Sequence, residues 1–222
     1  MEYKDLTDEQ KARARACDTP EEVLALAREE GYELSDAELE ANETPLTSLT
    51  LTGAPALLKL SLENTGLTEL DLTACTQLRI VQLAGTKAGW PISSMQAYLK
   101  YLDCSDTGID RFLITGDCTP LLETLNISGN PDLLRLELPT FPELTALDCS
   151  DTGLTDLKVD ANCKLTYLRA NGTKIETLDL RALKHLYVCE CYGGGTETIL
   201  ANRYADALYT GAEVQISQFD EN

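Results

Sequence analysis

The sequence is poor in aromatic residues, histidine and basic residues, and these shortages exclude several classes of protein. Its 222 residues include three Phe, one Trp and one His, and 37 acidic residues outnumber 18 basic ones, for a net charge of −19. A chain this acidic repels phosphate groups, which argues against partners such as nucleic acid or an anionic membrane surface. No apolar run is long enough to span a bilayer.

The side-chain combinations of common enzymes are also missing. His185 is the only histidine, and no acid is arranged beside it for a catalytic triad. There is no HExxH zinc motif, and the glycines at 193–195 are not followed by the Lys and Ser/Thr of a phosphate-binding loop. We therefore expect no enzyme activity, no catalytic residue, no cofactor and no metal, with His185 exposed in a turn.

The first residues, Met1 to Asp5, lack the basic and apolar segments of a secretory signal. The expectation is therefore a cytoplasmic protein by default. Export through a leader-type route is the alternative.

Leucine at a fixed period is what the sequence has in abundance. A Leu-x-x-Leu-x-Leu pattern, with apolar substitutes, recurs in steps of mostly 10 or 11 residues, which indicates stacked repeats. Alternation within each half-repeat predicts a strand, and Asn, Asp, Gly and Thr between them predict turns. Each coil of about 21 residues should therefore hold two parallel strands. The pattern begins at Leu46, Leu57, Leu67, Leu78, Leu99, Ile109, Leu122, Leu133, Leu144, Leu154, Leu165, Ile175 and Leu186.

Half-repeats such as Leu147-Asp-Cys-Ser-Asp-Thr-Gly-Leu154 resemble the leucine-rich repeat family, in its bacterial short nested form (the IRREKO type). The resemblance implies a repeat solenoid, mainly β, over residues 44–192, followed by a C-terminal cap and tail at 193–222. An irregular insertion at 85–98 replaces one half-repeat. In this family an Asn follows the strand of each repeat. In several repeats of this sequence we interpret Asp106, Asp151 or Gly172 as standing in its place. Residues 198–200, a short helix over 202–208 and residues 214–216 are interpreted as forming the C-terminal cap.

The eight cysteines follow the leucine pattern rather than a disulfide framework. Cys104, Cys149 and Cys191 occupy the last apolar position of the strand motif, and Cys189 occupies its middle position. A free cysteine behaves as a small buried hydrophobe, so we predict reduced core thiols. The Cys189-x-Cys191 spacing is not that of metal ligands.

Residues 1–43 differ in pattern from the repeats. Thr7, Thr19 and Ser35 are good N-caps and predict three short helices, the last over residues 36–41. Helices here would cover the exposed first repeat, as a solenoid requires. A small α-helical N-terminal cap is therefore one interpretation of this segment.

The same segment resembles, at residues 6–11, 19–32 and 34–40, the nitrogen-fixation-type leader peptides of ribosomally made, modified peptides. That resemblance implies a docking handle for a modifying enzyme, often ended by two glycines where an exporter-linked peptidase cuts. Here Ala41-Asn42-Glu43-Thr44 stands at that place. A cap and a leader are both compatible with the residues.

Stacking places equivalent outward-facing positions side by side, one coil apart. On the first predicted sheet these positions carry apolar and aromatic residues, which favour interfaces, although such residues also simply favour strands. On the second sheet Arg111, Arg135 and Asp156 belong to a solvated, charge-alternating face. Asp103 and Asp148 would lie two coils apart, which argues against a carboxylate pair or calcium site. The candidate partner-binding residues are Ile80, Trp90, Tyr101, Asp103, Tyr167, Arg169 and Val188.

Three functions remain open at this point. The first is a non-catalytic protein–protein interaction module that binds an unidentified protein through one sheet face. The second is a leader-bearing substrate or carrier for a modifying or export enzyme that docks on residues 1–43. The third is a surface adhesin.

Overall fold

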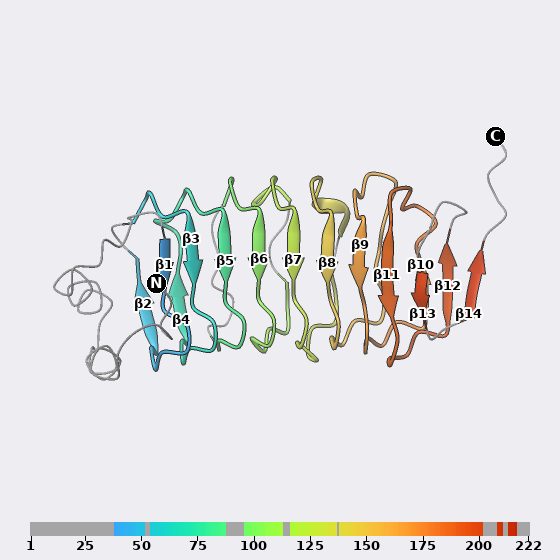
Figure 1. Ribbon diagram of the computed structural model, residues 1–222, viewed down its shortest axis with the longest axis horizontal. Coiled ribbons are helices and arrows are strands. Elements are labelled where there is room, and N and C mark those ends of the chain that lie inside the picture. Colours follow the sequence, from blue (N-terminus) through green and yellow to red (C-terminus); the bar gives the residue numbers. More distant parts are fainter. Residues whose placement is uncertain are drawn as a thin grey trace.

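The computed structural model describes residues 38–51, 54–87, 96–112, 116–136, 138–201, 208–210 and 213–216. Over these residues the chain winds into a stack of coils. Each coil runs along one side, turns and returns along the other, so the strands of the two sides point in opposite directions (Figure 1). The β-solenoid expected from the leucine period is therefore confirmed.

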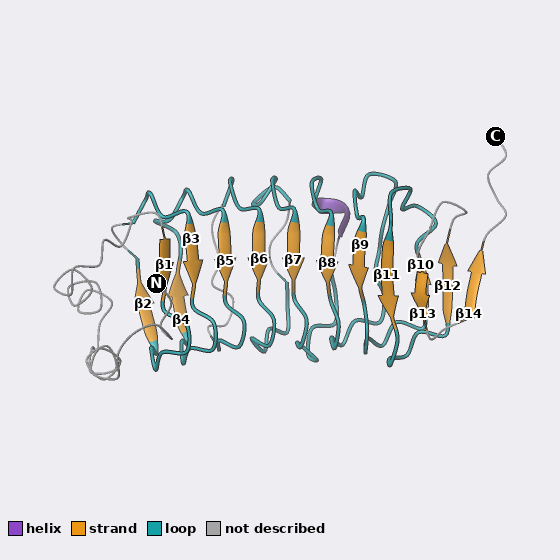
Figure 2. Ribbon diagram, viewed as in Figure 1, coloured by secondary structure: helices purple, strands orange, loops and turns teal. Residues whose placement is uncertain are grey.

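One side of the stack is a continuous parallel sheet (Figure 2). Its strands are three or four residues long, because each half-repeat offers one short alternation between two turns. Among the described residues nine strands form it, in the order β1 (Glu38–Glu40), β3 (Lys59–Ser61), β5 (Ile80–Gln82), β6 (Tyr101–Asp103), β7 (Thr124–Asn126), β8 (Ala146–Asp148), β9 (Tyr167–Arg169), β11 (Val188–Cys191) and β13 (Leu208–Thr210).

The pairing register of this sheet is the one predicted from the leucine pattern. A one-residue slip would turn every leucine of a strand toward solvent, so the apolar pattern specifies the register strongly. The first residues of successive strands form one column: Lys59, Ile80, Tyr101, Thr124, Ala146, Tyr167 and Val188.

The opposite side is less regular than predicted. Within the described residues it carries strands only near the two ends of the stack: β2 (Ser48–Thr50) with β4 (Glu69–Asp71), and β10 (Thr177–Asp179) with β12 (Thr198–Ala201) and β14 (Glu213–Ile216). The expectation of a second continuous charged sheet is wrong in the middle coils, where Arg111, Arg135 and Asp156 lie outside any strand. A 3₁₀ helix, Leu138–Thr140, stands in one of these coils. Prolines at 139 and 142 contribute to the break, because proline cannot donate to a ladder.

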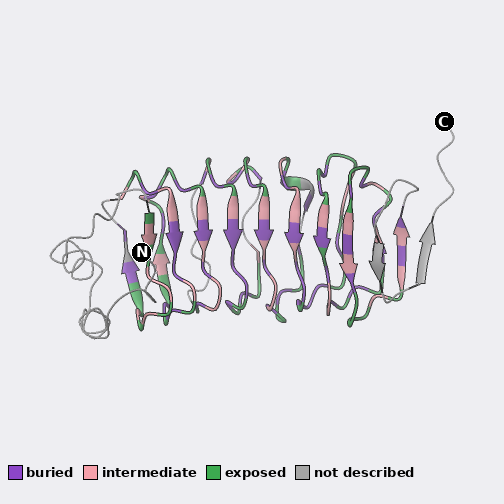
Figure 3. Cartoon of the chain, viewed as in Figure 1, coloured by how far each residue is buried: buried purple, intermediate pink, exposed green. Residues whose placement is uncertain are grey.

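The core is a set of stacked leucines between the two sides. The middle residues of strands such as β3, β6, β7 and β8, namely Leu60, Leu102, Leu125 and Leu147, are fully buried. In the strands of the continuous sheet from β3 to β11 a half-buried first residue is followed by a buried second residue (Figure 3). The predicted core placement of four cysteines is confirmed: Cys104, Cys149, Cys189 and Cys191 are buried free thiols.

The turns after the strands of the continuous sheet are closed by a buried polar residue. Thr107, Thr152 and Thr173 each donate a side-chain hydrogen bond to the carbonyl three residues earlier. Asn130 takes the same place in its own coil. Asp106, Asp151 and Gly172, which the sequence interpretation placed at the family's asparagine position, each precede one of these threonines and adopt positive φ.

The N-terminal end of the described chain also differs from expectation. The third helix, expected over residues 36–41, is not formed at Glu38–Glu40, which is the edge strand β1 paired with β3. The capping signal of Ser35 and Glu38 is local, whereas the open edge of β3 offers backbone partners that override it. The two earlier helices lie outside the described residues.

At the C-terminal end the coils continue beyond residue 192. In the segment interpreted as a C-terminal cap, Thr198–Ala201 is a strand that pairs with β10, and Glu213–Ile216 adds the next strand. Leu208, predicted to end a helix, instead begins β13, which pairs with β11. The remainder of that predicted helix, residues 202–207, lies outside the described residues.

Candidate interaction surface

The outward face of the continuous sheet carries the first-residue column. Ile80 and Tyr101 are neighbours across β5 and β6, and Tyr167 and Val188 are neighbours across β9 and β11. All four side chains are half-buried, because each is flanked by the strands on either side. The sheet thus brings four of the candidate contact residues onto one face, in two pairs separated by two strands.

Both tyrosines of this column are held by a neighbour on the same strand. The Tyr101 hydroxyl donates to Asp103 Oδ2 at 3.4 Å, and the Arg169 guanidinium lies 5.4 Å from the centre of the Tyr167 ring. Burial raises the pKa of Tyr101, and the Asp103 carboxylate acts in the same direction. The Tyr101 hydroxyl therefore stays protonated well into the alkaline range.

Asp103 supports the fold more than it faces solvent. It is 8% exposed, and its Oδ1 accepts hydrogen bonds from the backbone N–H and hydroxyl of Ser105 at 2.9 and 2.7 Å. Its Oδ2 accepts from Asn126 Nδ2 at 3.0 Å. The Asp-x-Ser sequence thus builds a turn at the end of the strand.

Arg169 is the exposed member of the candidate set among the residues that the structure describes. Its Nε donates to Glu190 Oε2 at 2.9 Å, and its Nη1 lies 3.9 Å from Asp148 Oδ2. The hydrogen bond to Glu190 raises the pKa of Arg169. The guanidinium is therefore shared between two carboxylates from the neighbouring coils. Trp90, the remaining candidate, lies outside the described residues.

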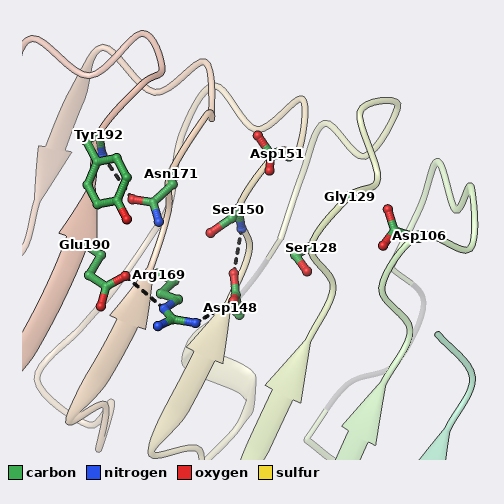
Figure 4. Close-up of a pocket in the computed structure, with 10 residues that line it drawn as sticks. All are labelled: Asp106, Ser128, Gly129, Asp148, Ser150, Asp151, Arg169, Asn171, Glu190 and Tyr192. Atoms are coloured by element: carbon green, nitrogen blue, oxygen red, sulfur yellow. Dashed lines mark hydrogen bonds and ion pairs between the residues drawn. The ribbon is translucent and has the colours of Figure 1, made fainter. Parts of the chain in front are cut away.

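A shallow groove of about 400 Å³ runs along the ends of these strands, where the sheet meets the turns (Figure 4). Four carboxylates and one guanidinium line it, together with hydroxyl and amide groups. The lining residues are Asp106, Ser128, Gly129, Asp148, Ser150, Asp151, Arg169, Asn171, Glu190 and Tyr192.

Sequence reasoning found Arg169 but missed this groove. Its members come from turns of successive coils and meet only through stacking. The repeated Asp-x-Ser motif at the strand ends is the signal that marks the place, since Asp148 Oδ1 accepts the Ser150 N–H at 3.0 Å just as Asp103 holds Ser105.

The described residues contain no group of three or more His, Cys, Asp or Glu side chains arranged to hold a metal ion. His185 is exposed, as expected. Over the same described part of the chain, no helix has the length and apolar character needed to cross a membrane.

Comparison with known families matches residues 8–39 to the Nif11 domain. This range coincides with the leader-like resemblance, and its last two residues begin β1. A search of curated proteins gave no match.

Solved structures of bacterial leucine-rich repeat proteins share the fold. The functional domain of InlJ from Listeria monocytogenes, which includes a cysteine ladder, is 19% identical with a TM-score of 0.60, covering 86% of this chain and 51% of its own. YopM from Yersinia enterocolitica WA-314 is 20% identical with a TM-score of 0.54, covering 82% and 43%. The leucine-rich repeat protein LIC12759 from Leptospira interrogans is 16% identical with a TM-score of 0.52, covering 81% and 60%.

This chain therefore spans between 43% and 60% of the length of those three chains. At these identities the likeness concerns the fold alone. The chain has the leucine-rich repeat fold, and residues 8–39 add a Nif11-like segment to it.

Proposed function

We propose that this chain is a non-catalytic protein-interaction module that binds a partner protein through the outward face of the continuous sheet. The observation that carries the proposal is the in-register column containing Ile80, Tyr101, Tyr167 and Val188. Tyrosine and aliphatic side chains on an open strand face supply apolar contact area with a polar tip. Stacked repeats also present the extended surface that such binding uses.

The geometry of the two tyrosines favours binding. Tyr101 is hydrogen-bonded to Asp103, and Tyr167 is covered by Arg169. Side chains that are already ordered lose less conformational entropy when a partner is bound. The column is therefore a partly preorganised surface.

The experiment is affinity capture from an extract of the native host on the immobilised full-length chain. We expect Tyr101→Ala combined with Tyr167→Glu to lose a partner that the parent chain retains. The matched control is Tyr98→Ala combined with Tyr187→Glu, because these tyrosines are 47% and 66% exposed and lie outside the column. Retention of every partner by the column variant would overturn the proposal.

A second candidate function rests on the Nif11 match at residues 8–39. In this proposal the segment recruits a peptide-modifying enzyme, and the repeat body is its substrate or a carrier. The described cysteines other than Cys118 are buried. A modifying enzyme would therefore reach them before the solenoid folds and not afterwards.

Intact mass of the protein purified from its native host tests the second candidate. A mass shift, or loss of the N-terminal segment, would support it. An unmodified mass with residues 1–43 retained would reject it. Fractionation of the same cells would test the cytoplasmic location expected from the sequence, and the adhesin alternative stays a prediction.

A further inference from the structure

We propose that the groove at the strand ends of β6, β7, β8, β9 and β11 binds a lysine- or arginine-rich segment of a partner protein. The inference rests on the proposed function, because it assigns a chemistry to the partner of the same sheet. It adds a charged subsite next to the apolar column.

The charge of the groove is the first argument. Of its four carboxylates, Asp148 and Glu190 share the Arg169 guanidinium. Asp106 and Asp151 are exposed and have no ion-pair partner within the described part of the chain. Two carboxylates thus remain uncompensated on a protein whose net charge is −19, so the groove attracts cations.

The second argument is an unpaired hydroxyl in the groove. Ser150 is 8% exposed, and its Oγ has no hydrogen-bond partner among the described residues. At the equivalent positions of other coils, Ser105 Oγ donates to Asp103 and Ser128 Oγ donates to Asn126. Ser150 instead lies among the groove residues with its hydroxyl unused (Figure 4). A buried hydroxyl without a partner is unfavourable, and a bound donor would relieve it.

The spacing of the carboxylates selects the kind of cation. Asp106 and Asp151 belong to turns two coils apart, which is about 10 Å at the spacing of paired strands. A single metal ion needs its ligands within roughly 2.6 Å, so these two cannot share one ion. A segment in the polyproline II conformation has three residues per turn and rises about 3.1 Å per residue, so basic side chains three residues apart lie on one face about 9 Å apart and match the separation. Ammonium and guanidinium groups can also donate to Ser150 Oγ.

The test is titration of the full-length protein with a synthetic hexalysine peptide at a fixed salt concentration of about 0.1 M. We expect Asp106→Asn combined with Asp151→Asn to weaken binding at least about tenfold. The matched control, Asp132→Asn combined with Asp156→Asn, removes the same charge from exposed positions outside the groove, and should change affinity less than about threefold. Equal effects of the two pairs would mean non-specific attraction and would overturn the inference.

Ser150→Ala supplies a readout that separates binding from folding. The hydroxyl makes no hydrogen bond in the free protein, so the thermal midpoint should stay the same or rise. Affinity for hexalysine should fall about threefold, since the ammonium group loses an acceptor. Unchanged affinity in this variant would remove Ser150 from the site and contradict the inference.

The failures of the two proposals are distinguishable. If hexalysine binding depends on the groove while the tyrosine-column variant retains every captured partner, the proposed function fails and the subsite stands. If hexalysine binding ignores the groove while the column variant loses a partner, the inference fails and the proposed function stands.

Discussion

The carboxylate of Asp106 lies over Gly129 of the next coil and occupies the space that a Cβ on Gly129 would need. Both residues have positive φ, 55° at Asp106 and 68° at Gly129. The turn therefore combines a short polar side chain with a glycine that makes room for it. Two other pairs along the stack repeat the relationship: Asn64 with Gly85, and Asp151 with Gly172.

Replacing Gly129 by Ala should destabilise the protein more than the same change at Gly108. Both positions have positive φ, 68° and 74°, so each alanine costs roughly 1–2 kcal/mol for its left-handed conformation. The space around Gly108 is open, whereas a Cβ at Gly129 meets Asp106 Oδ1, so the exposed Asp106 side chain must leave its rotamer, which adds roughly 0.5–1.5 kcal/mol. Urea denaturation measures the free energy of unfolding of both alanine variants. Adding Asp106→Gly to Gly129→Ala should remove the extra loss seen at position 129. Equal losses at the two glycines would contradict the explanation.

Asn130 should be among the most sensitive polar residues of the solenoid. It is fully buried, and its Oδ1 accepts the backbone N–H groups of Gly108 and Ile109 at 2.8 and 3.1 Å. Its Nδ2 donates to the carbonyls of Cys104 and Ile127 at 2.9 and 2.8 Å. Asn130→Ala takes the side-chain acceptor from the Gly108 and Ile109 N–H groups, whereas the Cys104 carbonyl keeps its bond from Thr107. We expect a loss of at least about 3 kcal/mol in the free energy of unfolding.

The conservative change at the same position provides the control. Asn130→Thr should lose less stability than Asn130→Ala, because Thr107 and Thr152 close the corresponding turns of other coils by donating to a carbonyl. The thermal unfolding midpoints of the two variants give the order of their stabilities. If the threonine variant is no more stable than the alanine variant, the turn type and not the hydrogen bond determines the stability loss at this position.

The register of the continuous sheet could be predicted because its strands from β3 to β11 bury their second residue. Leu102 and Leu147 specify where their strands pair, and any slip would expose them. The opposite side could not be predicted equally well. Its half-repeats also carry leucines, but Pro139 interrupts one of them, and strand formation there depends on partners in the adjacent coils rather than on local pattern.

The candidate site was predictable in part for the same reason. Tyr101 and Tyr167 follow directly from the strand register, so the sequence places them on one face. The groove depends on turn geometry, which leucine spacing does not encode. Ser150 and Asn171 become neighbours of Arg169 only when three turns stack with the correct left-handed residues.

The buried thiols should make stability fall at alkaline pH. Burial raises the pKa of Cys104 and Cys149 far above the ordinary thiol range. In the unfolded chain these thiols ionise near about pH 8.5, so above that pH the native state holds more protons than the unfolded state. Their contribution is complete below this pH and is lost as pH rises, by about 1.4 kcal/mol per pH unit for each thiol.

Urea unfolding under reducing conditions, at about pH 8 and about pH 10.5, checks the expectation. The matched variant is Cys104→Val combined with Cys149→Val, because Ile127 occupies the same core column. The variant should lose less stability over this interval than the parent chain. Parallel losses would mean that groups other than these two thiols control the alkaline transition.

The residues that directly follow the Nif11 match are hydrogen-bonded to the neighbouring coil of the solenoid. Beyond β1, the Ala41 and Glu43 N–H groups donate to the carbonyls of Ser61 and Glu63 at 2.9 and 2.7 Å. Asn42 Oδ1 accepts from the Ser61 hydroxyl at 2.9 Å and from the Glu63 N–H at 2.7 Å. Residues 41–43, where the leader resemblance implies a cut, are therefore held as part of a coil.

Proteolysis between residues 41 and 43 should consequently require local opening. Asn42→Ala removes two hydrogen bonds, worth roughly 1 kcal/mol each, so the open form should be more populated and cleavage there about tenfold or more faster. Limited proteolysis of the full-length chain, with cut sites assigned by mass spectrometry, measures this rate. Asn162→Ala, a change at an exposed asparagine in a distant turn, should leave the rate unchanged. Rapid cleavage at 41–43 in the parent chain would show instead that this junction opens freely and is accessible to a leader peptidase.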